Sequence, residues 1–215
     1  QAAAWKDGVV QQMTGGVASL FKANGVTWAQ GNGRFTDAKT IAVEGQEDVT
    51  FANAIIATGS YPMRPPIPGL DSPRCVDSTG LLAQTEVPRR LVVLGGGIIG
   101  CEFASIFQRF GTEVTIVEML DRLIPQEDGD ATKELQKALT KRGITLHLGK
   151  QCTQVDDTGS GLVVHFGEGE TVDSEVEWRG EPRPPRPGEA GRLFKTPSRF
   201  WQDWLAQSRY PGRWR

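Results

Sequence analysis

Three glycines carry the clearest chemical signal in the sequence. Gly95, Gly97 and Gly100 lie in the stretch LGGGIIG and have the spacing G-x-G-x-x-G. In a loop that binds a pyrophosphate, the first glycine permits a tight turn and the second lets the backbone approach the phosphates. The third lets the following helix pack closely. The N-terminus of that helix directs N–H groups and a partial positive charge at the phosphates. The spacing therefore predicts a phosphate-binding loop.

An acidic residue beyond this loop narrows the predicted ligand. Glu118 follows the glycines by about 20 residues, where a carboxylate accepts hydrogen bonds from the adenosine ribose hydroxyls. A 2′-phosphate on that ribose would meet like charge, so the pattern predicts NAD in preference to NADP. Arg122 lies nearby in the sequence and could offset part of this repulsion. The predicted ligand is an adenine dinucleotide.

The elements around the glycines occur in the order that such a site needs. Residues 91–94 and 114–117 are short apolar runs rich in β-branched residues, typical of buried parallel strands. Between them we predict a helix over about residues 98–110, ended by Gly111. Unrelated glycines beside a surface glutamate would not be expected to have strands and a helix in this order. The apolar side of the helix is predicted to comprise Ile98, Ile99, Phe103, Ile106, Phe107 and Phe110.

The remainder of the chain alternates helices and strands. The first 24 residues predict a helix with Trp5, Val9, Met13, Val17, Leu20 and Phe21 on one apolar face. A stretch with five prolines, residues 61–73, predicts a stiff, extended crossover between domains. Asp77 or Ser78 is expected to cap a short helix after it. Short strands are predicted at residues 26–35, 40–44 and 48–57.

After Glu118 the pattern predicts a helix, a strand and a meander. Residues 128–143 form an amphipathic pattern in which Leu135, Ala138 and Leu139 are expected to point inward. Residues 144–149 predict a strand, and residues 152–176 a meander with a turn at 159–161. His147 and His165 lie in the strand patterns without a predicted carboxylate partner or second ligand, so we expect packing or solvent-facing roles rather than catalysis.

Composition limits the other classes of function. The formal net charge is −2, which suggests no general affinity for nucleic acid or membrane. No apolar run approaches the ~20 residues of a membrane span, and we expect a cytoplasmic protein, although an N-terminal targeting segment could precede the given sequence. The three cysteines, Cys75, Cys101 and Cys152, form no C-x-x-C pair or metal-ligand cluster, so each is predicted to be a small buried apolar residue.

The pattern changes at Trp178. Residues 178–215 contain six of the 13 prolines and four of the six tryptophans, and show no sustained periodicity. Such a segment is not expected to supply a central strand. We hypothesise that it is a non-native or out-of-frame continuation.

Several motifs in order resemble dihydrolipoamide dehydrogenase, a flavin- and NAD-dependent disulfide oxidoreductase. They are MTGGVASLFKANGVTWAQGNGRF, IIATGSYPMRPPIPGL, DSTGLL, EVPRRLVVLGGGIIGCEFASIF and EMLDRLIP, all within residues 1–177. The resemblance implies an α/β fold, with a doubly wound Rossmann-type NAD-binding domain inserted in a partial FAD-binding domain. It assigns residues 1–66 to the FAD-binding domain, 67–88 to the crossover and short helix, and 89–177 to an incomplete NAD-binding domain. Residues 178–215 remain an atypical tail.

The resemblance also implies site residues and cofactors. Both FAD and NAD are expected, the FAD site being incomplete in this chain, and a homodimer is possible as in the family. Glu102 matches a residue that orients the nicotinamide ring, although a first-turn acid could equally be explained by the helix dipole. Cys152 matches a position beside the adenine. The positions matched to FAD are Gly33, Thr58, Gly59 and Ser60, and those matched to NAD are Gly95, Gly96, Gly97, Ile98, Ile99, Gly100, Cys101, Glu102, Glu118 and Cys152.

Other family features have no counterpart in the given sequence. These are the first G-x-G-x-x-G for FAD, the C-x-x-x-x-C redox pair and the His–Glu base, so no catalytic residue is assigned and we expect negligible lipoamide turnover from the isolated chain. Two alternatives stay open. One is a non-catalytic nucleotide-binding fragment or assembly module, and the other is a sister flavin reductase for glutathione or mercuric ion.

Overall fold

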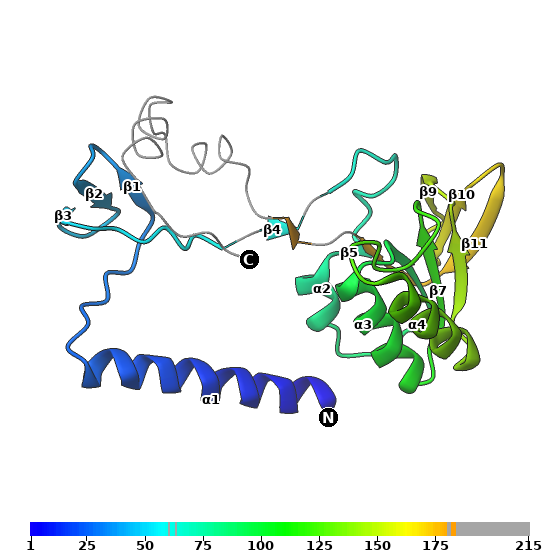
Figure 1. Cartoon of the computed structure of the whole chain (residues 1–215), viewed down its shortest axis with the longest axis horizontal. Coiled ribbons are helices and arrows are strands. Elements are labelled where there is room, and N and C mark those ends of the chain that lie inside the picture. The colour runs from blue at the N-terminus through cyan, green and yellow to red at the C-terminus, as the bar shows by residue number, and fades with distance from the viewer. Residues whose placement is uncertain (60, 63, 180–181, 184–215) are drawn as a thin grey trace. The chain divides into compact units, whose positions relative to one another are not determined.

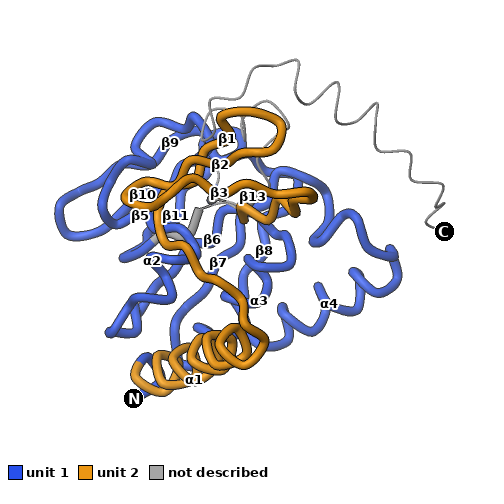
Figure 2. The backbone as a smooth tube through the Cα atoms, turned by 90° about the vertical axis from the view of Figure 1, so that its left-hand side faces the viewer, with its two compact units in different colours: residues 1–3, 62–183 blue, residues 4–61, 184–215 orange. Residues whose placement is uncertain are grey.

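The computed structural model describes the chain except for residues 60, 63, 180–181 and 184–215 (Figure 1). The chain divides into two compact units (Figure 2). Of the described residues, those in Gln1–Ala3 and Pro62–Arg183 belong to unit 1 and those in Ala4–Tyr61 to unit 2. The crossover therefore falls in the same unit as the glycine loop. The assignment of the two parts to FAD and NAD domains stays a prediction.

Unit 1 is built on a parallel five-stranded sheet. Its strand order is β5 (Cys75–Val76), β12 (Val176–Arg179), β6 (Arg90–Leu94), β7 (Glu113–Glu118) and β8 (Thr145–Leu148). Every neighbouring pair is parallel, as in a Rossmann-type sheet. The strands predicted at 91–94, 114–117 and 144–149 and the α/β fold class are confirmed.

Both faces of this sheet are covered, which explains the continuous apolar run in β6. Leu91 and Val93 belong to a core with helices α2 (Ser78–Leu82), α3 (Ile98–Arg109) and α4 (Gly129–Lys141). Val92 and Leu94 belong to a second core with an antiparallel meander (Figure 1). The meander consists of β9 (Cys152–Asp157), β10 (Leu162–Phe166) and β11 (Glu170–Ser174). Unit 1 thus has three layers, with the parallel sheet in the middle.

The helix after the glycines is confirmed, but its predicted inner side is partly wrong. Phe103 and Phe107 are buried, whereas Ile98, Ile106 and Phe110 are exposed. The buried residues of α3 are Gly100, Cys101, Phe103, Ala104 and Phe107. Small residues at 100 and 104 let the helix axis come close to the sheet, and this turns the bulkier isoleucines away from it.

Helix α4 shows a similar difference. Asp128 caps it by accepting from the N–H groups of Asp130 and Ala131. Thr132 and Leu139 are buried, and Leu135 packs on the core, but Ala138 is exposed, so its predicted inward position is wrong. The inner face therefore follows positions 132, 135 and 139, three and four residues apart.

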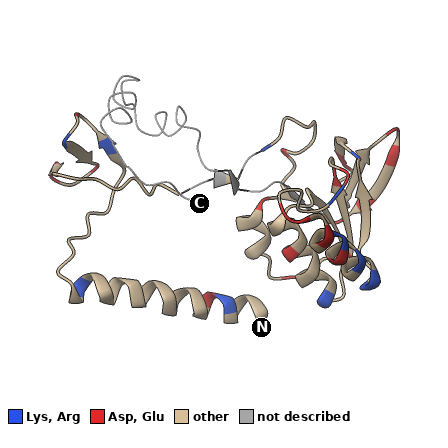
Figure 3. Ribbon diagram, viewed as in Figure 1, with Lys and Arg blue, Asp and Glu red and all other residues tan. Residues whose placement is uncertain are grey.

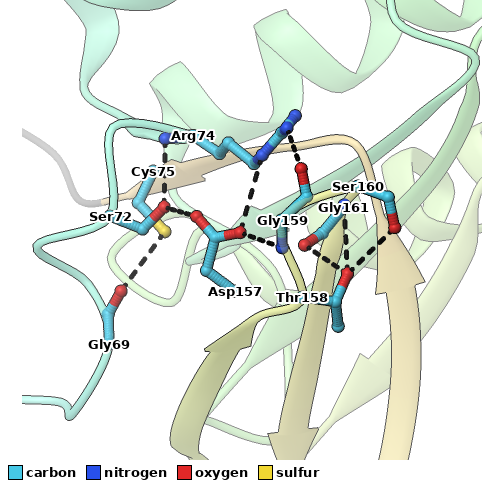
Figure 4. Close-up of polar contacts among 9 residues, drawn as sticks. All are labelled: Gly69, Ser72, Arg74, Cys75, Asp157, Thr158, Gly159, Ser160 and Gly161. Carbon is cyan, nitrogen blue, oxygen red and sulfur yellow. Dashed lines mark hydrogen bonds and ion pairs between the residues drawn. The ribbon is translucent and has the colours of Figure 1, made fainter.

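The crossover is attached to the meander rather than extended throughout (Figure 4). The N–H of Val155 donates to the carbonyl of Pro68 at 2.9 Å, and Leu70 is fully buried. Gly69 has φ +85°, and a Cβ there would lie 1.7 Å from the Val155 carbonyl oxygen, so only glycine fits. The expectation of an extended crossover is wrong for residues 68–74, which turn and pack on β9.

A polar cluster secures the end of this crossover to the β9–β10 turn (Figure 4). Ser72 Oγ donates to Asp157 Oδ2 at 2.5 Å, and Arg74 donates to the Gly159 carbonyl at 2.7 Å. The pKa of Asp157 lies below its ordinary value, because Ser72 and then the Gly159 N–H donate to its carboxylate. The cluster joins segments 85 residues apart in the sequence.

The beginning of the tail lies in the sheet. Strand β12 includes Trp178 and Arg179, which pair with Val93 and Leu94 of β6. The expectation that no central strand begins at residue 178 is therefore wrong for these two residues. Their backbone continues the ladder begun by Val176. Apart from the two-residue strand β13 (Pro182–Arg183), the remainder of the predicted tail lies outside the described residues.

Unit 2 contains one long helix and one small antiparallel sheet. The helix α1 (Ala2–Ala23) is confirmed, none of its residues is buried, and its charged residues lie only near its ends (Figure 3). The sheet consists of β1 (Gly33–Phe35), β2 (Thr40–Val43) and β3 (Val49–Thr50). The strands predicted at 26–35 and 48–57 are therefore too long, because the ladder pairs only a few residues on either side of β2. Strand β4 (Tyr61–Pro62) follows.

Candidate nucleotide-binding site

The glycine loop makes a tight turn between β6 and α3, at the carboxyl edge of the sheet. Gly95 has φ +107°, a conformation that favours glycine, and its N–H donates to the Val117 carbonyl at 2.9 Å. Gly97 is the N-cap residue of α3. Ligands of open α/β sheets bind at this edge of the sheet. The loop therefore lies where a nucleotide would be held.

The N-terminus of α3 differs from those of the other two helices of unit 1. Asp77 accepts from the N–H of Gly80 at the start of α2, and Asp128 plays the same part for α4. No side chain of the described residues caps α3 at Gly97. The first N–H groups of a helix need acceptors, and an anion can supply them. The loop can thus accept a phosphate where an aspartate cap would repel one.

Glu118 ends β7 beside this loop with its carboxylate already oriented. Its side chain is 9% exposed, and Oε2 accepts from the N–H of Gly96 at 2.6 Å while Oε1 accepts from the N–H of Leu120 at 2.7 Å. An ionised carboxylate has about four lone-pair sites. Each oxygen therefore keeps one site for a further donor, which suits the two neighbouring hydroxyls of a ribose.

Arg122 does not neutralise this carboxylate. Its guanidinium donates to the carbonyl of Pro125, within the loop that follows β7. In the part of the chain that the structure describes, Glu118 has no ion-pair partner within 4.0 Å. A 2′-phosphate would approach an uncompensated negative charge.

Comparison with known proteins identifies the family of the chain. The profile described as pyridine nucleotide-disulphide oxidoreductase matches residues 1–176, most of the chain. The chain belongs to the pyridine nucleotide-disulphide oxidoreductase family. Members of this family are flavoproteins that use a pyridine nucleotide, so a nucleotide site beside a glycine loop is expected of them.

Curated relatives that this chain matches include dihydrolipoyl dehydrogenases. The chain is 40% identical over 176 residues to the enzyme named so from Vibrio cholerae and 37% identical over 181 residues to that from Halobacterium salinarum. Each match covers 80% of this chain but only 37% or 38% of the relative. The chain thus spans less than two-fifths of the length of the curated relatives it matches.

Solved structures of flavoprotein oxidoreductases share the fold. The HOCl-induced flavoprotein disulfide reductase RclA from Escherichia coli has 30% identity and a TM-score of 0.68, covering 78% of this chain and 39% of that one. LpdA from Mycobacterium tuberculosis has a TM-score of 0.78 at 24% identity, covering 89% of this chain and 44% of that one, and supports the fold alone.

The helices of the described residues include none with the length and apolar character of a membrane span.

The structure brings together most of the residues predicted for NAD. Ile98, Ile99 and Gly100 lie in the first turn of α3, and the exposed Glu102 follows in its second turn, so its description as a first-turn acid is wrong. Cys101 is buried, and its Sγ donates to the Gly96 carbonyl at 3.5 Å. The β8–β9 connection, which leads to Cys152, joins the loop after β7 through two backbone bonds. They run from the N–H groups of Gly149 and Lys150 to the carbonyls of Leu120 and Glu118.

The residues predicted for FAD belong to unit 2. Gly33 begins β1 and pairs with Val43. Thr58 and Gly59 are exposed, and Gly59 has φ +72°. Ser60 lies outside the described residues. Their role in binding FAD stays a prediction.

The sequence did not assign Leu120 or Ile124 to the site, and it placed Gly96 there without showing how tightly that position is packed. Gly96 was matched only as part of the loop, yet a Cβ there would lie 2.4 Å from Leu123 Cδ2 and 3.2 Å from the Cβ of Glu118. Leu120 orients the glutamate, and Ile124 donates its N–H to the Gly96 carbonyl at 2.9 Å. The run of three consecutive glycines was the available signal that the middle position is also restricted.

The three cysteines and the two histidines all lie in unit 1. All three cysteines are buried, as predicted, and the described residues contain no group of three His, Cys, Asp or Glu suited to a metal. His147 packs on Phe166 with ring centroids 4.6 Å apart. His165 Nε2 lies 2.8 Å from Asp156 Oδ2, so the prediction that it lacks a carboxylate partner is wrong. Donors from Gln154 and then His165 hold the pKa of Asp156 below its ordinary value.

Proposed function

We propose that this chain is the portion of an NAD-dependent dihydrolipoamide dehydrogenase that binds NAD(H) for hydride transfer with FAD. The identity of 37–40% to dihydrolipoyl dehydrogenases supports the substrate class. The supporting geometry is the uncapped α3 N-terminus beside an oriented Glu118 carboxylate. When bound together, the nicotinamide and flavin rings supply the hydride chemistry, while the protein supplies positioning.

The single observation that carries this proposal is the pair of backbone N–H groups on Glu118. The N–H of Gly96 holds one oxygen and the N–H of Leu120 holds the other, so the carboxylate keeps its orientation before any ligand arrives. Fixed acceptors lose little conformational freedom on binding. Glu118 would bind the ribose diol, the α3 N-terminus would bind the diphosphate, and Glu102 would lie toward the nicotinamide end. The same arrangement makes NAD the preferred nucleotide over NADP.

The other steps of the family reaction need parts beyond this segment. Cys75, Cys101 and Cys152 are too far apart in sequence to form a C-x-x-x-x-C pair, and all three are buried in unit 1. In the proposed full protein, the disulfide, its base, the remaining FAD contacts and a homodimer interface would come from elsewhere. Gly33, Thr58, Gly59 and Ser60 would then contribute backbone contacts to FAD. The isolated chain is expected to turn over lipoamide negligibly.

Titration of the purified chain with NADH and NADPH, followed by nicotinamide fluorescence, tests the proposal. NADH should bind more tightly than NADPH. Glu118→Gln should weaken NADH binding and reduce the difference in affinity between NADH and NADPH. Glu113→Gln is the matched control, because Glu113 is an exposed glutamate at the opposite end of the same strand. Absence of NADH binding by the folded chain, or equal binding of NADPH, would contradict the proposal.

A second candidate shares the nucleotide site but differs in substrate. The similarity to the flavoprotein disulfide reductase RclA, at 30% identity and a TM-score of 0.68, favours a flavin disulfide reductase of another specificity. Steady-state assays of the full-length protein would distinguish the two. Dihydrolipoamide should reduce NAD through the enzyme under the first proposal, and should be inert under the second.

A further inference from the structure

Residues 119–125, which we call the strap, follow Glu118 and lie against the glycine loop. The strap contacts the Glu118 carboxylate near its start and the glycine loop near its end. Near its start, the N–H of Leu120 donates to Glu118 Oε1 at 2.7 Å. Near its end, the N–H of Ile124 donates to the Gly96 carbonyl at 2.9 Å. Gly96 in turn donates to Glu118 Oε2, so Glu118, Gly96 and the strap form one closed set of hydrogen bonds.

Leu123 packs beside Gly96. Its side chain is 0% exposed and belongs to the core between the sheet and the helices. It lies so close to Gly96 that a Cβ on that glycine would be 2.4 Å from Leu123 Cδ2. Real Cβ atoms do not approach this closely, so Leu123 occupies the space that a side chain at position 96 would need and packs against the glycine from the side of the strap.

The backbone of the strap is strained at one residue. Ile124 has φ +44°, the one positive φ of a non-glycine residue among those described. A β-branched residue in this conformation is a genuine outlier and persists only when the surrounding structure imposes it. The surroundings here are the buried Leu123 on one side and the hydrogen bond to Gly96 on the other. Strain of this kind is concentrated at sites that must hold a defined geometry.

A third contact supports the strap from the β8–β9 connection. The N–H of Gly149 donates to the Leu120 carbonyl at 2.7 Å, and the N–H of Lys150 donates to the Glu118 carbonyl at 2.9 Å. The guanidinium of Arg122 closes the strap on itself by donating to Pro125. The strap is therefore attached to the parallel sheet as well as to the glycine loop.

We propose that Leu123 and Ile124 are positioning residues, which hold the glycine loop and the Glu118 carboxylate in the arrangement that accepts a nucleotide. They act through Gly96 and Leu120 and need not contact the ligand. This inference rests on the proposed function for its consequence on NADH, but the arrangement itself exists without nucleotide. It therefore predicts effects in the nucleotide-free chain as well.

Amide hydrogen exchange and NADH titration of Leu123→Ala test the proposal. We expect the amides of Gly96 and Leu120 to lose protection from hydrogen exchange in the nucleotide-free variant. NADH should bind to the variant about tenfold more weakly, an effect of the size that residues in contact typically have on each other. Leu139→Ala is the matched control, because Leu139 is an equally buried leucine of the same core but belongs to α4. It should lower overall stability similarly while leaving both amides protected and NADH affinity unchanged.

A double variant separates positioning from general damage. Gly96→Ala should weaken NADH binding because its new Cβ meets Leu123. Adding Leu123→Ala vacates the space of Cδ2, so the double variant should bind NADH more tightly than the sum of the two single losses predicts. Only part of the loss should be recovered, since the contact of the new Cβ with Glu118 remains.

The possible outcomes are distinct. If Leu123→Ala behaves like Leu139→Ala in amide exchange, the strap is not a positioning element. Additive losses of NADH affinity in the double variant would also refute the positioning role of Leu123. Failure of the unmodified chain to bind NADH would refute the proposed function instead. In that case the exchange result still decides the role of the strap, since loss of protection at Gly96 and Leu120 supports it and retained protection refutes it.

Discussion

An aspartate at position 97 should improve the helix and impair the nucleotide site. Gly97 is the N-cap of α3 with φ −72° and ψ −176°, close to the φ −88° and ψ −175° of Asp77, which caps α2. Gly97→Asp can therefore adopt the capping conformation without backbone strain. Its carboxylate would accept from the first N–H groups of α3, the same groups that we assign to the diphosphate.

The two effects have opposite signs and can be estimated separately. A negative charge near a helix N-terminus stabilises by about 0.3–1 kcal/mol, so the free energy of unfolding should be unchanged or slightly raised. Two unit charges 4 Å apart repel by about 1 kcal/mol in bulk water and about 4 kcal/mol at an effective dielectric constant of 20. Because about 1.4 kcal/mol corresponds to a tenfold change, NADH binding should weaken by about fivefold to several hundredfold.

Gly97→Asn provides the control, because asparagine caps helices about as well as aspartate and has nearly the same shape without the charge. Dissociation constants for NADH should rise in the order glycine, asparagine, aspartate, and added salt should narrow the gap between the last two. Equal NADH binding by the two variants would refute the electrostatic reasoning. Wild-type affinity in both would show that the diphosphate does not bind at α3.

Three further predictions concern stability. Glu118→Gln should lower the free energy of unfolding by about 1.5–3 kcal/mol, because the amide NH₂ group must then face one of the two backbone N–H donors. Denaturant unfolding measures this loss of stability. Leu70→Ala should lower the free energy of unfolding by about 2–5 kcal/mol, whereas Leu82→Ala, at a half-exposed position, should lower it far less. Equal losses of stability in the two variants would argue against the packing of the crossover on the meander. The pKa of Asp157 is lowered chiefly by the Ser72 hydrogen bond. The ionised Asp157 therefore stabilises the folded chain fully at pH values above the ordinary aspartate pKa. This stabilisation is lost as the pH falls through the lowered pKa that Asp157 has in the folded chain. Acid unfolding curves below about pH 4 should therefore be less steep in Ser72→Ala, and an unchanged pH dependence would contradict this role.

The glycine loop and its flanking strands could be predicted because their signals are local. Glycine spacing, β-branched runs and an acid at the end of a strand each act over a few residues. The inner face of α3 could not be predicted from hydrophobicity, because the small residues Gly100 and Ala104 decide which side approaches the sheet. Ile98 and Ile106 are consequently exposed although they are strongly apolar.

Contacts between distant segments were also beyond the sequence. The pairing of His165 with Asp156 depends on strand register, and that register shifts between His165 and Phe166. The strap was visible only as part of a family motif, since its contact with Gly96 needs the three-dimensional path of the loop. The strands of unit 2 were predicted too long because alternation shows where a strand can form, whereas pairing decides where it ends.

The most direct measurement is the change in amide chemical shifts of the isotopically labelled chain on adding ADP-ribose, which carries the diphosphate and the adenosine ribose without the nicotinamide. The largest shifts should fall on the amides of Gly97, Ile98 and Ile99 at the start of α3, and on those of Gly96 and Leu120, which hold the Glu118 carboxylate. Saturable shifts confined to other residues, or none in the folded chain, would contradict a nucleotide site at this loop.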